Sequence, residues 1–161
     1  MRLTTLCYIE RNGQYLMLHR VKKKQDENEG KWIGVGGHME ENEAPEECIQ
    51  REVMEETGLT LTSLRLRGIL TFILPDWGNE LTFLYTATAE GKISPDCREG
   101  ELQWVPVEKI PSLSLWEGDR AFLPLLREDT PCFSMKLIYA PGGKLTRCLL
   151  NGKEMKLDFK I

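Results

Sequence analysis

Apolar and β-branched residues gather in two short runs near the N-terminus, residues 4–10 and 15–21. Between them lies Asn12-Gly13, flanked by polar residues. An Asn-Gly pair between two apolar runs is the strongest short-range signal for a β-hairpin, because both residues tolerate a positive φ. We therefore predict two antiparallel strands joined by a tight turn.

The central segment has the pattern of a short strand followed by a helix. Residues 31–37 are apolar and glycine-rich and are expected to form a strand. Pro45 is a favoured first helical residue, and Gly58 suits the position just after a helix. We expect a helix over residues 45–57. Ile49 and Val53 are four residues apart and would both face the protein core from one side of this helix.

The remaining apolar runs predict more strands and one more helix. The strands are expected at residues 61–74, with Gly68 as a bend or bulge, and at 80–89, 102–107, 133–139 and 145–150, and the helix at 118–128. Residues 151–161 would either add a strand or fray. Many strands with few helices and no linker or internal repeat indicate an α+β fold with a mixed sheet, in a single domain over residues 1–161.

The composition narrows the class of protein. The chain has 161 residues, 41% of them hydrophobic and 29% charged, with a net charge of −4 and a pI near 5.4. This charge argues against a surface for nucleic acid polymers, although a nucleotide could still bind through a metal. The N-terminus lacks the apolar core of a signal peptide, and no apolar run is long enough to span a bilayer. We expect a cytoplasmic protein without a membrane partner, either a monomer or a homodimer.

The cysteines do not suggest a metal site. Their number is odd, no C-x-x-C occurs and the spacings match no zinc pattern. We expect buried free thiols at Cys7, Cys48, Cys97, Cys132 and Cys148.

Three glutamates in the predicted helix point to a hard cation. Glu52, Glu55 and Glu56 are at positions i, i+3 and i+4 and share one side of the helix. Like charges at this spacing destabilise an isolated helix by about 0.2–0.5 kcal/mol per pair. A bound cation would account for them, and oxygen ligands suit Mg²⁺, with Mn²⁺ as a substitute.

Two common phosphate-binding loops are excluded. The glycines of residues 31–37 do not continue as G-x-G-x-x-G, because Met39 stands where the last glycine would be. The pattern G-x-x-x-x-G-K-[ST] is absent. The central segment is therefore neither a Rossmann nor a Walker site.

The central segment instead resembles the Nudix box, G-x5-E-x7-R-E-U-x-E-E-x-G-U, where U is aliphatic. The positions are filled by Gly37, Glu43, Arg51, Glu52, Val53, Glu55, Glu56, Gly58 and Leu59. The resemblance implies the Nudix fold, an α/β/α sandwich around a mixed sheet. It also implies metal-dependent hydrolysis of a nucleoside diphosphate linked to another group.

The same resemblance suggests roles for individual residues. Glu52, Glu55 and Glu56 match the catalytic metal-binding carboxylates of the family, and the carbonyl of Gly37 commonly joins them. Arg51 matches the arginine that orients the glutamates, and Glu43 matches a structural glutamate. A further metal ligand or general base often comes from a later loop, where Glu99 is the first candidate and Glu101 the second.

The segment from Trp116 to Asp119 and the apolar helix after it resemble the base-binding part of MutT-type members that hydrolyse 8-oxo-dGTP. Ile33 stands where those proteins have an Asn, and Gly118 where they have the first of two Asp. The predicted substrate-binding residues are Thr5, Trp32, Ile33, Trp116 and Asp119.

The hypothesis from sequence is Mg²⁺-dependent hydrolysis of a nucleoside triphosphate, with 8-oxo-dGTP as the first candidate, to the monophosphate and pyrophosphate. Ordinary dNTPs or nucleotide sugars remain alternative substrates. A nucleotide-binding module without activity is an alternative of another class.

Overall fold

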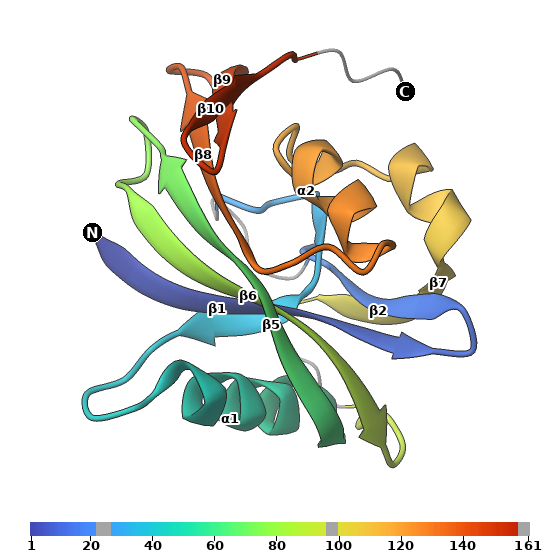
Figure 1. Cartoon of the computed structure of the whole chain (residues 1–161). Coiled ribbons are helices and arrows are strands. Elements are labelled where there is room, and N and C mark those ends of the chain that lie inside the picture. The colour runs from blue at the N-terminus through green and yellow to red at the C-terminus, as the bar shows by residue number, and fades with distance from the viewer. Residues whose placement is uncertain (22–26, 96–99, 158–161) are drawn as a thin grey trace.

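The computed structural model describes residues 1–21, 27–95 and 100–157 as a strongly curved mixed sheet with helices on both sides (Figure 1). The strands are β1 (Arg2–Arg11), β2 (Gln14–His19), β3 (Trp32–Ile33), β4 (Val35–His38), β5 (Thr60–Ile73), β6 (Glu80–Glu90), β7 (Glu101–Pro106), β8 (Phe133–Tyr139), β9 (Leu145–Leu150) and β10 (Lys153–Met155). The helices are α1 (Pro45–Thr57), the 3₁₀ helix η1 (Val107–Ser112) and α2 (Asp119–Leu126).

The strand order in the described residues is β10-β9-β8-β5-β6-β1-β2-β3. In addition, β4 pairs with β1 and β7 pairs with β2. The β1–β6 and β5–β8 pairs are parallel and the other pairs are antiparallel. The α+β class with a mixed sheet is therefore confirmed.

The hairpin expected at the N-terminus is present. Glu10 pairs with Tyr15, and Asn12 and Gly13 have φ of 53° and 73°. Two positive φ values in a two-residue turn match the right-handed twist of the strands. Strand β1 therefore takes part in two groups of pairs, because its end pairs with β2 whereas residues 4–7 pair with β4 and residues 2–9 with β6.

Helix α1 begins and ends where the sequence predicted. The N–H of Ala44 donates to Glu47 Oε1 at 2.8 Å, so the first turn is closed by a side chain from within the helix. At the other end Gly58 has φ of 77°, and its N–H donates to the carbonyl of Met54 at 3.0 Å. A left-handed residue at this place is the usual glycine stop.

Two hydrophobic clusters lie on opposite sides of the sheet. Tyr8 belongs to the cluster that contains Phe122 of α2, whereas its neighbour Ile9 belongs to the cluster that contains Ile49 and Val53 of α1. Successive strand residues point to opposite faces, so β1 contributes to both clusters. Figure 1 shows α1 below the sheet and α2 above it, which is the α/β/α layering that the resemblance implied.

Glycines in two strands are required by close packing. At Gly68 the register of β5 against β6 shifts, and a Cβ there would lie 2.8 Å from the ring of Phe133. This confirms the expected bulge. At Gly36 a Cβ would overlap the carbonyl oxygen of Thr5 in the paired strand β1.

Several expectations were wrong in detail. Residues 31–37 form two short strands that separate at Gly34 and pair with different partners, β2 and β1. Val107 begins η1 rather than ending a strand, and α2 spans Asp119–Leu126, shorter than residues 118–128. Cys132 is exposed.

The other described cysteines, Cys7, Cys48 and Cys148, are buried and free as expected, and Cys97 lies outside the described residues. No helix in the described part of the chain is long and apolar enough to cross a membrane.

The packing at Gly36 leads to a test of the sheet. We expect Gly36→Ala to lower the free energy of unfolding by about 3 kcal/mol, because the new methyl group collides with backbone that cannot rotate away. Gly78→Ala is the matched control, since Gly78 has φ of 92° with open space around it, and should cost about 1 kcal/mol. Urea denaturation of both variants checks the difference, and equal losses would contradict the assigned β1–β4 register.

Candidate functional site

The site is built where β4 leads through a loop into α1. Thr5 of β1 pairs with Gly37 of β4, which brings the end of this strand next to the helix. A Cβ on Gly37 would lie 2.7 Å from either carboxylate oxygen of Glu52. Glycine at this position therefore allows the Glu52 carboxylate to lie directly against the backbone.

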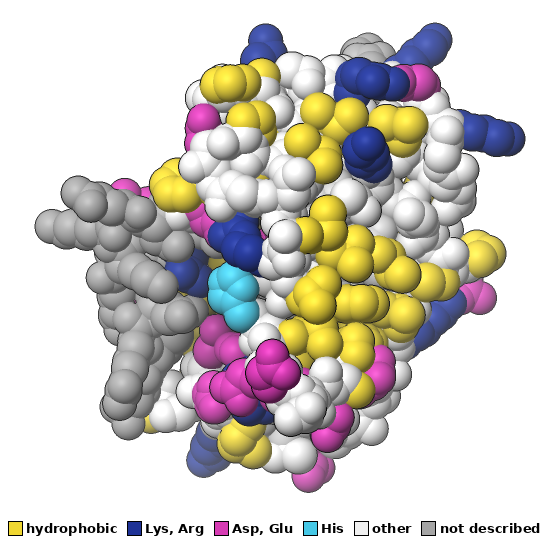
Figure 2. Space-filling view, turned by 90° about the vertical axis from the view of Figure 1, so that its left-hand side faces the viewer, with side chains coloured by type: hydrophobic (Ala, Val, Ile, Leu, Met, Phe, Trp, Pro, Cys, Tyr) yellow, Lys and Arg dark blue, Asp and Glu magenta, His cyan; other side chains and the backbone are white. Residues whose placement is uncertain are grey.

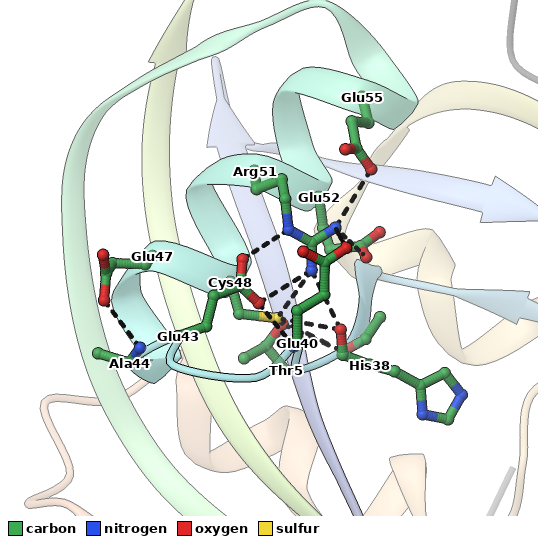
Figure 3. A network of polar contacts seen from close by, with 11 residues as sticks. Thr5, His38, Glu40, Glu43, Ala44, Glu47, Cys48, Arg51, Glu52 and Glu55 are labelled. Carbon is green, nitrogen blue, oxygen red and sulfur yellow. Dashed lines mark hydrogen bonds and ion pairs between the residues drawn. The ribbon is translucent and has the colours of Figure 1, made fainter.

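Arg51 is the centre of the polar network in the loop (Figure 3). Its Nε and Nη2 donate to the two oxygens of Glu43 at 2.6 and 3.0 Å. Its Nη2 also donates to the carbonyl of His38 at 3.1 Å, and its Nη1 to Glu52 Oε1 at 2.9 Å. One guanidinium thus joins the loop before the helix to a carboxylate on the helix.

Glu55 lies on the outer side of this network. Its carboxylate accepts from Arg51 Nη1 at 3.2 Å, and the side chain is 59% exposed, against 15% for Glu52. Figure 3 shows it reaching back toward Arg51 from the next turn of α1. The three glutamates therefore divide into Glu55, which lies beside Arg51, and the pair of Glu52 and Glu56, which lines a cavity.

The electrostatics of these carboxylates differ. Hydrogen bonds from Arg51 and from the N–H of Glu40 lower the pKa of Glu43 to about 2. Burial raises the pKa of Glu52, although Arg51 acts in the opposite direction. A side-chain hydrogen bond also joins Glu52 to Glu56. Glu43 is thus a permanently ionised partner of Arg51, whereas Glu52 and Glu56 form a close, partly buried carboxyl pair.

A cavity of about 410 Å³ opens beside this pair. Its lining combines acidic, small and aromatic residues: Thr4, Thr5, Leu6, Tyr8, Arg20, Glu27, Asn28, Ile33, Gly34, Gly36, Gly37, His38, Met39, Glu40, Glu52, Glu56, Phe72, Leu74, Glu80, Thr82, Trp116, Asp119 and Tyr139. On the face seen in Figure 2, acidic side chains gather next to a broad group of hydrophobic ones.

Trp116 is held firmly in the cavity wall. Its Nε1–H donates to Asn28 Oδ1 at 2.7 Å, and Lys31 Nζ lies 5.6 Å from the centre of its ring. The ring of Tyr139 meets it edge-on at 5.5 Å between centroids. A wall fixed in this way offers a rigid aromatic surface to a flat ligand.

Asp119 is a buried carboxyl in the same wall. It opens α2, is 5% exposed, and its pKa is raised to about 7, chiefly by burial. A hydrogen bond with the backbone of Trp116 and the charges of Arg120 and Lys31 act against this increase. The group can therefore change between carboxyl and carboxylate near neutral pH.

A second cluster of charged side chains lies at another part of the cavity, which Glu27 and Glu80 line. Arg2 Nη1 donates to Glu27 Oε1 at 2.9 Å, and Arg2 Nη2 lies 3.5 Å from Glu80 Oε1. Burial raises the pKa of Glu80, which Arg2 partly offsets. This ion pair ties the loop around Glu27 to the start of β6.

Most of the residues predicted for the site meet at this cavity. The structure brings together Thr5, Ile33, Gly37, Glu52, Glu56, Trp116 and Asp119 as lining residues. Arg51 does not line the cavity but donates a hydrogen bond to Glu52, which does, and the resemblance implied such a contact. Glu99 lies outside the described residues, and Glu101 is an exposed residue at the start of β7.

Trp32 does not have the predicted place. It is not among the residues that line the cavity, and its ring stacks on His19 at 4.4 Å between centroids. The two residues are opposite each other in the β2–β3 pair, which directs Trp32 toward its strand neighbour. Local sequence carries no sign of this cross-strand stacking.

Other lining residues were not foreseen. Asn28 lies in a polar loop that resembles any solvated loop, and Tyr139 reads as a core residue of a strand. Phe72 of β5 lies opposite Leu137 of β8, and these two strands are parallel. No local sequence pattern indicates parallel pairing, so only the assembled sheet shows that Phe72 and Tyr139 line the same cavity.

The donor set at the box suits a hard cation. In the ranges that the structure describes, no three His, Cys, Asp or Glu side chains form a metal cluster. Glu52, Glu56 and the carbonyl of Gly37 nevertheless offer oxygen atoms at one place, and Glu56 Oε2 is buried there. Two close carboxyl groups next to a carbonyl are oxygen ligands of the kind that Mg²⁺ and Mn²⁺ prefer, completed by water and phosphate.

Comparison with known proteins agrees with this geometry. The family model described as NUDIX domain matches residues 1–126. The chain is 30% identical over 127 residues to the oxidized purine nucleoside triphosphate hydrolase of Danio rerio, covering 78% of this chain and 79% of that protein. It is 27% identical over 157 residues to the Nudix hydrolase YvcI of Bacillus subtilis (strain 168), covering 94% and 96%.

A solved structure agrees as well. The MutT protein of Bacillus halodurans superposes with a TM-score of 0.83 at 26% identity, over 95% of this chain and 99% of that one. The likeness therefore extends beyond the box to the C-terminal strands. The chain belongs to the Nudix hydrolase family and is of the MutT type.

Proposed function

We propose that this protein is a Mg²⁺-dependent nucleoside triphosphate pyrophosphohydrolase that acts on oxidised purine nucleotides such as 8-oxo-dGTP. The products would be the monophosphate and pyrophosphate. The observation that supports this proposal is a single cavity lined by the carboxyl pair Glu52 and Glu56 and also by Trp116 and Asp119. Such a cavity has a place for phosphates and a place for a base.

In this proposal Glu52, Glu56 and the carbonyl of Gly37 hold the metal, and Glu99 is a further candidate ligand or base. Glu55, which the resemblance also gave as a ligand, is left out of this set because it contacts Arg51 and does not line the cavity. When bound, Mg²⁺ neutralises phosphate charge and lowers the pKa of a water. The chain's own task is to keep its ligands in place. Phosphoryl transfer depends mainly on positioning and on charge neutralisation, so this support matters for the rate.

Arg51 supplies this support. It contacts the carboxylates of Glu43, Glu52 and Glu55 at 3.2 Å or less. Burial raises the pKa of Glu52, and the hydrogen bond and positive charge of Arg51 act against this increase. Arg51 therefore acts through Glu52 rather than on the substrate.

The base would lie against Trp116, which is fixed by Asn28 and Lys31. Asp119 would meet its polar edge. The name of the Danio rerio relative supports an oxidised purine as the substrate. Ile33, which lines the cavity where 8-oxo-dGTP hydrolases of the family have an Asn, leaves the polar reading of the base to other residues.

The carboxyl pair leads to the first prediction for activity. We expect Glu56→Gln to lower kcat by about 10²-fold or more with folding intact, because an amide is a poor ligand for Mg²⁺. Glu55→Gln should lose less, since Glu55 contacts Arg51 at the exposed side. Pyrophosphate release with and without Mg²⁺ measures both losses.

Glu90→Gln, at the exposed end of β6, is the control and should keep full activity. Near-wild-type turnover of Glu56→Gln with Mg²⁺ would refute the assigned metal site.

The substrate is tested by comparing nucleotides. We expect kcat/KM for 8-oxo-dGTP to exceed that for dGTP, dATP and nucleotide sugars. Steady-state pyrophosphate or phosphate release across this panel is the measurement. A kcat/KM for dGTP equal to that for 8-oxo-dGTP would end the proposal of an oxidised purine but not that of a hydrolase.

Asp119 gives a prediction for pH. Its pKa in the folded protein, about 7, lies above the ordinary 3.8, so the folded state holds this proton more tightly than the unfolded state. The resulting stability is present below pH 4 and is lost as pH rises through 7, by up to about 4 kcal/mol. Asp119→Asn has no such proton.

The free energy of unfolding of the wild type, relative to Asp119→Asn, should therefore fall between pH 5 and pH 8. Urea denaturation of both proteins at the two pH values measures it. A difference that stays constant with pH would show that Asp119 is ionised throughout this range.

A further inference from the structure

The space around Gly118, rather than its backbone conformation, requires a glycine at this position. Its φ and ψ are −63° and −28°, which any residue can adopt. A Cβ there, however, would lie 2.6 Å from the hydroxyl oxygen of Tyr139 and 3.1 Å from Leu137 Cδ2. The missing side chain at position 118 thus makes room for the hydroxyl group of Tyr139.

Tyr139, which carries that hydroxyl group, lines the cavity, and one hydrogen bond of the hydroxyl group is defined. The N–H of Gly118 donates to Tyr139 Oη at 2.7 Å, so the oxygen is an acceptor in this bond and keeps its own hydrogen to donate. Tyr139 is 3% exposed and lines the cavity together with Asp119. Burial, and then the charge of Asp119, raise the pKa of Tyr139, so the phenol stays protonated.

Asp119 has the complementary property. Its carboxylate form only accepts hydrogen bonds, and it follows Gly118 directly in the chain. The cavity wall therefore presents a hydroxyl donor and a carboxylate acceptor beside the ring of Trp116. Neither Asp119 alone nor Trp116 provides this pairing.

We propose that Tyr139 determines specificity by donating its hydroxyl hydrogen to a carbonyl oxygen of the base while Asp119 accepts a hydrogen from the adjacent ring N–H. This inference rests on the proposed function and deepens it. The ligand class is a base with a carbonyl next to a ring N–H, an arrangement found in guanine and twice in 8-oxoguanine. Gly118 belongs to the same device because it admits the hydroxyl group.

Adenine has the opposite order, with an amino group beside an unprotonated ring nitrogen. If the base of a nucleotide stacks on Trp116 while its phosphates lie at Glu52 and Glu56, the base cannot flip without moving the phosphates away. The amino group would then face the hydroxyl donor, and the ring nitrogen would face the carboxylate. A site that leaves such groups unpaired discriminates more strongly than an apolar pocket does.

The alternative is that the hydroxyl group only supports the start of α2 through Gly118. In that case its loss would weaken the binding of all nucleotides alike, or only lower stability. The ratio of kcat/KM for 8-oxo-dGTP to kcat/KM for dATP separates the two roles.

The test is Tyr139→Phe, assayed with Mg²⁺ at pH 8, where Asp119 is ionised. We expect kcat/KM for 8-oxo-dGTP relative to dATP to fall about tenfold or more, mainly through KM. Tyr15→Phe is the matched control, because Tyr15 is buried in the same hydrophobic cluster but is not a lining residue. An unchanged ratio in folded Tyr139→Phe would overturn the proposal.

Gly118→Ala provides a second route that keeps the phenol. Its methyl group would displace the hydroxyl, so it should lower the same ratio, and it should add little to Tyr139→Phe, where no hydroxyl remains to collide. This variant decides the question if Tyr139→Phe does not fold. A Gly118→Ala protein with the wild-type ratio would contradict the proposed device.

Binding of the monophosphates 8-oxo-dGMP and dAMP, measured by calorimetry without metal, keeps the two proposals apart. If the wild type releases no pyrophosphate from any nucleotide, the proposed function fails. A selective loss of 8-oxo-dGMP binding in Tyr139→Phe would still support the role of Tyr139, and equal binding would refute it.

Discussion

The contact between Arg51 and Glu43 is the interaction on which the site depends. Two parallel hydrogen bonds of 2.6 and 3.0 Å fix the guanidinium against the loop, and such bidentate pairs add direction as well as energy. The N–H of Glu40 donates to the same carboxylate at 2.8 Å, so Glu43 also closes the loop on itself. With its position fixed, Arg51 offers its remaining hydrogens to the carbonyl of His38 and to Glu52. This cation thereby lies against the Glu52 carboxylate of the partly buried pair of Glu52 and Glu56 and acts against the effect of burial on its pKa.

The sheet turns this local network into a cavity. Strand β1 pairs with β4 at Thr5 and Gly37 and in parallel with β6, while its other end forms the hairpin with β2. Residues of β1 therefore reach the clusters on both sides of the sheet, and Thr5 of the same strand lines the cavity. The carboxyl pair comes from α1 on one side, whereas Asp119 comes from α2 on the other. A ligand in the cavity would thus touch both layers, which is how a fold with one curved sheet can hold the phosphates and the base of the same nucleotide.

The sequence predicted what is encoded within one turn or one hairpin and missed what the sheet assembles. The Asn12-Gly13 turn and the start of α1 at Pro45 follow from local spacing, whereas the place of Arg51 beside Glu52 was implied by the resemblance to the Nudix box. The division among the glutamates was not predicted, although helix geometry accounts for it: at about 100° per residue, Glu56 lies about 40° from Glu52, and Glu55 lies about 40° from Arg51. Trp32 was misplaced because its stacking on His19 depends on the β2–β3 pairing. Tyr139 was missed because its strand reaches the cavity through a parallel pairing with β5, far away in the chain.

Two glycines, Gly37 in the cavity lining and Gly118 next to the lining residues Asp119 and Tyr139, show the same physical solution. At Gly37 the space of a side chain is taken by the carboxylate of Glu52, and at Gly118 it is taken by the hydroxyl group of Tyr139. Each glycine lets a polar group from another element lie directly against the backbone. This close packing restricts the positions that the polar group can take. The Gly37 arrangement belongs to the box, and in the proposed function it serves the phosphates. The Gly118 arrangement involves Tyr139 of β8, whose hydroxyl group lies where a Cβ at position 118 would be. If Tyr139 reads the base as proposed, a larger residue at position 118 would exclude this hydroxyl group.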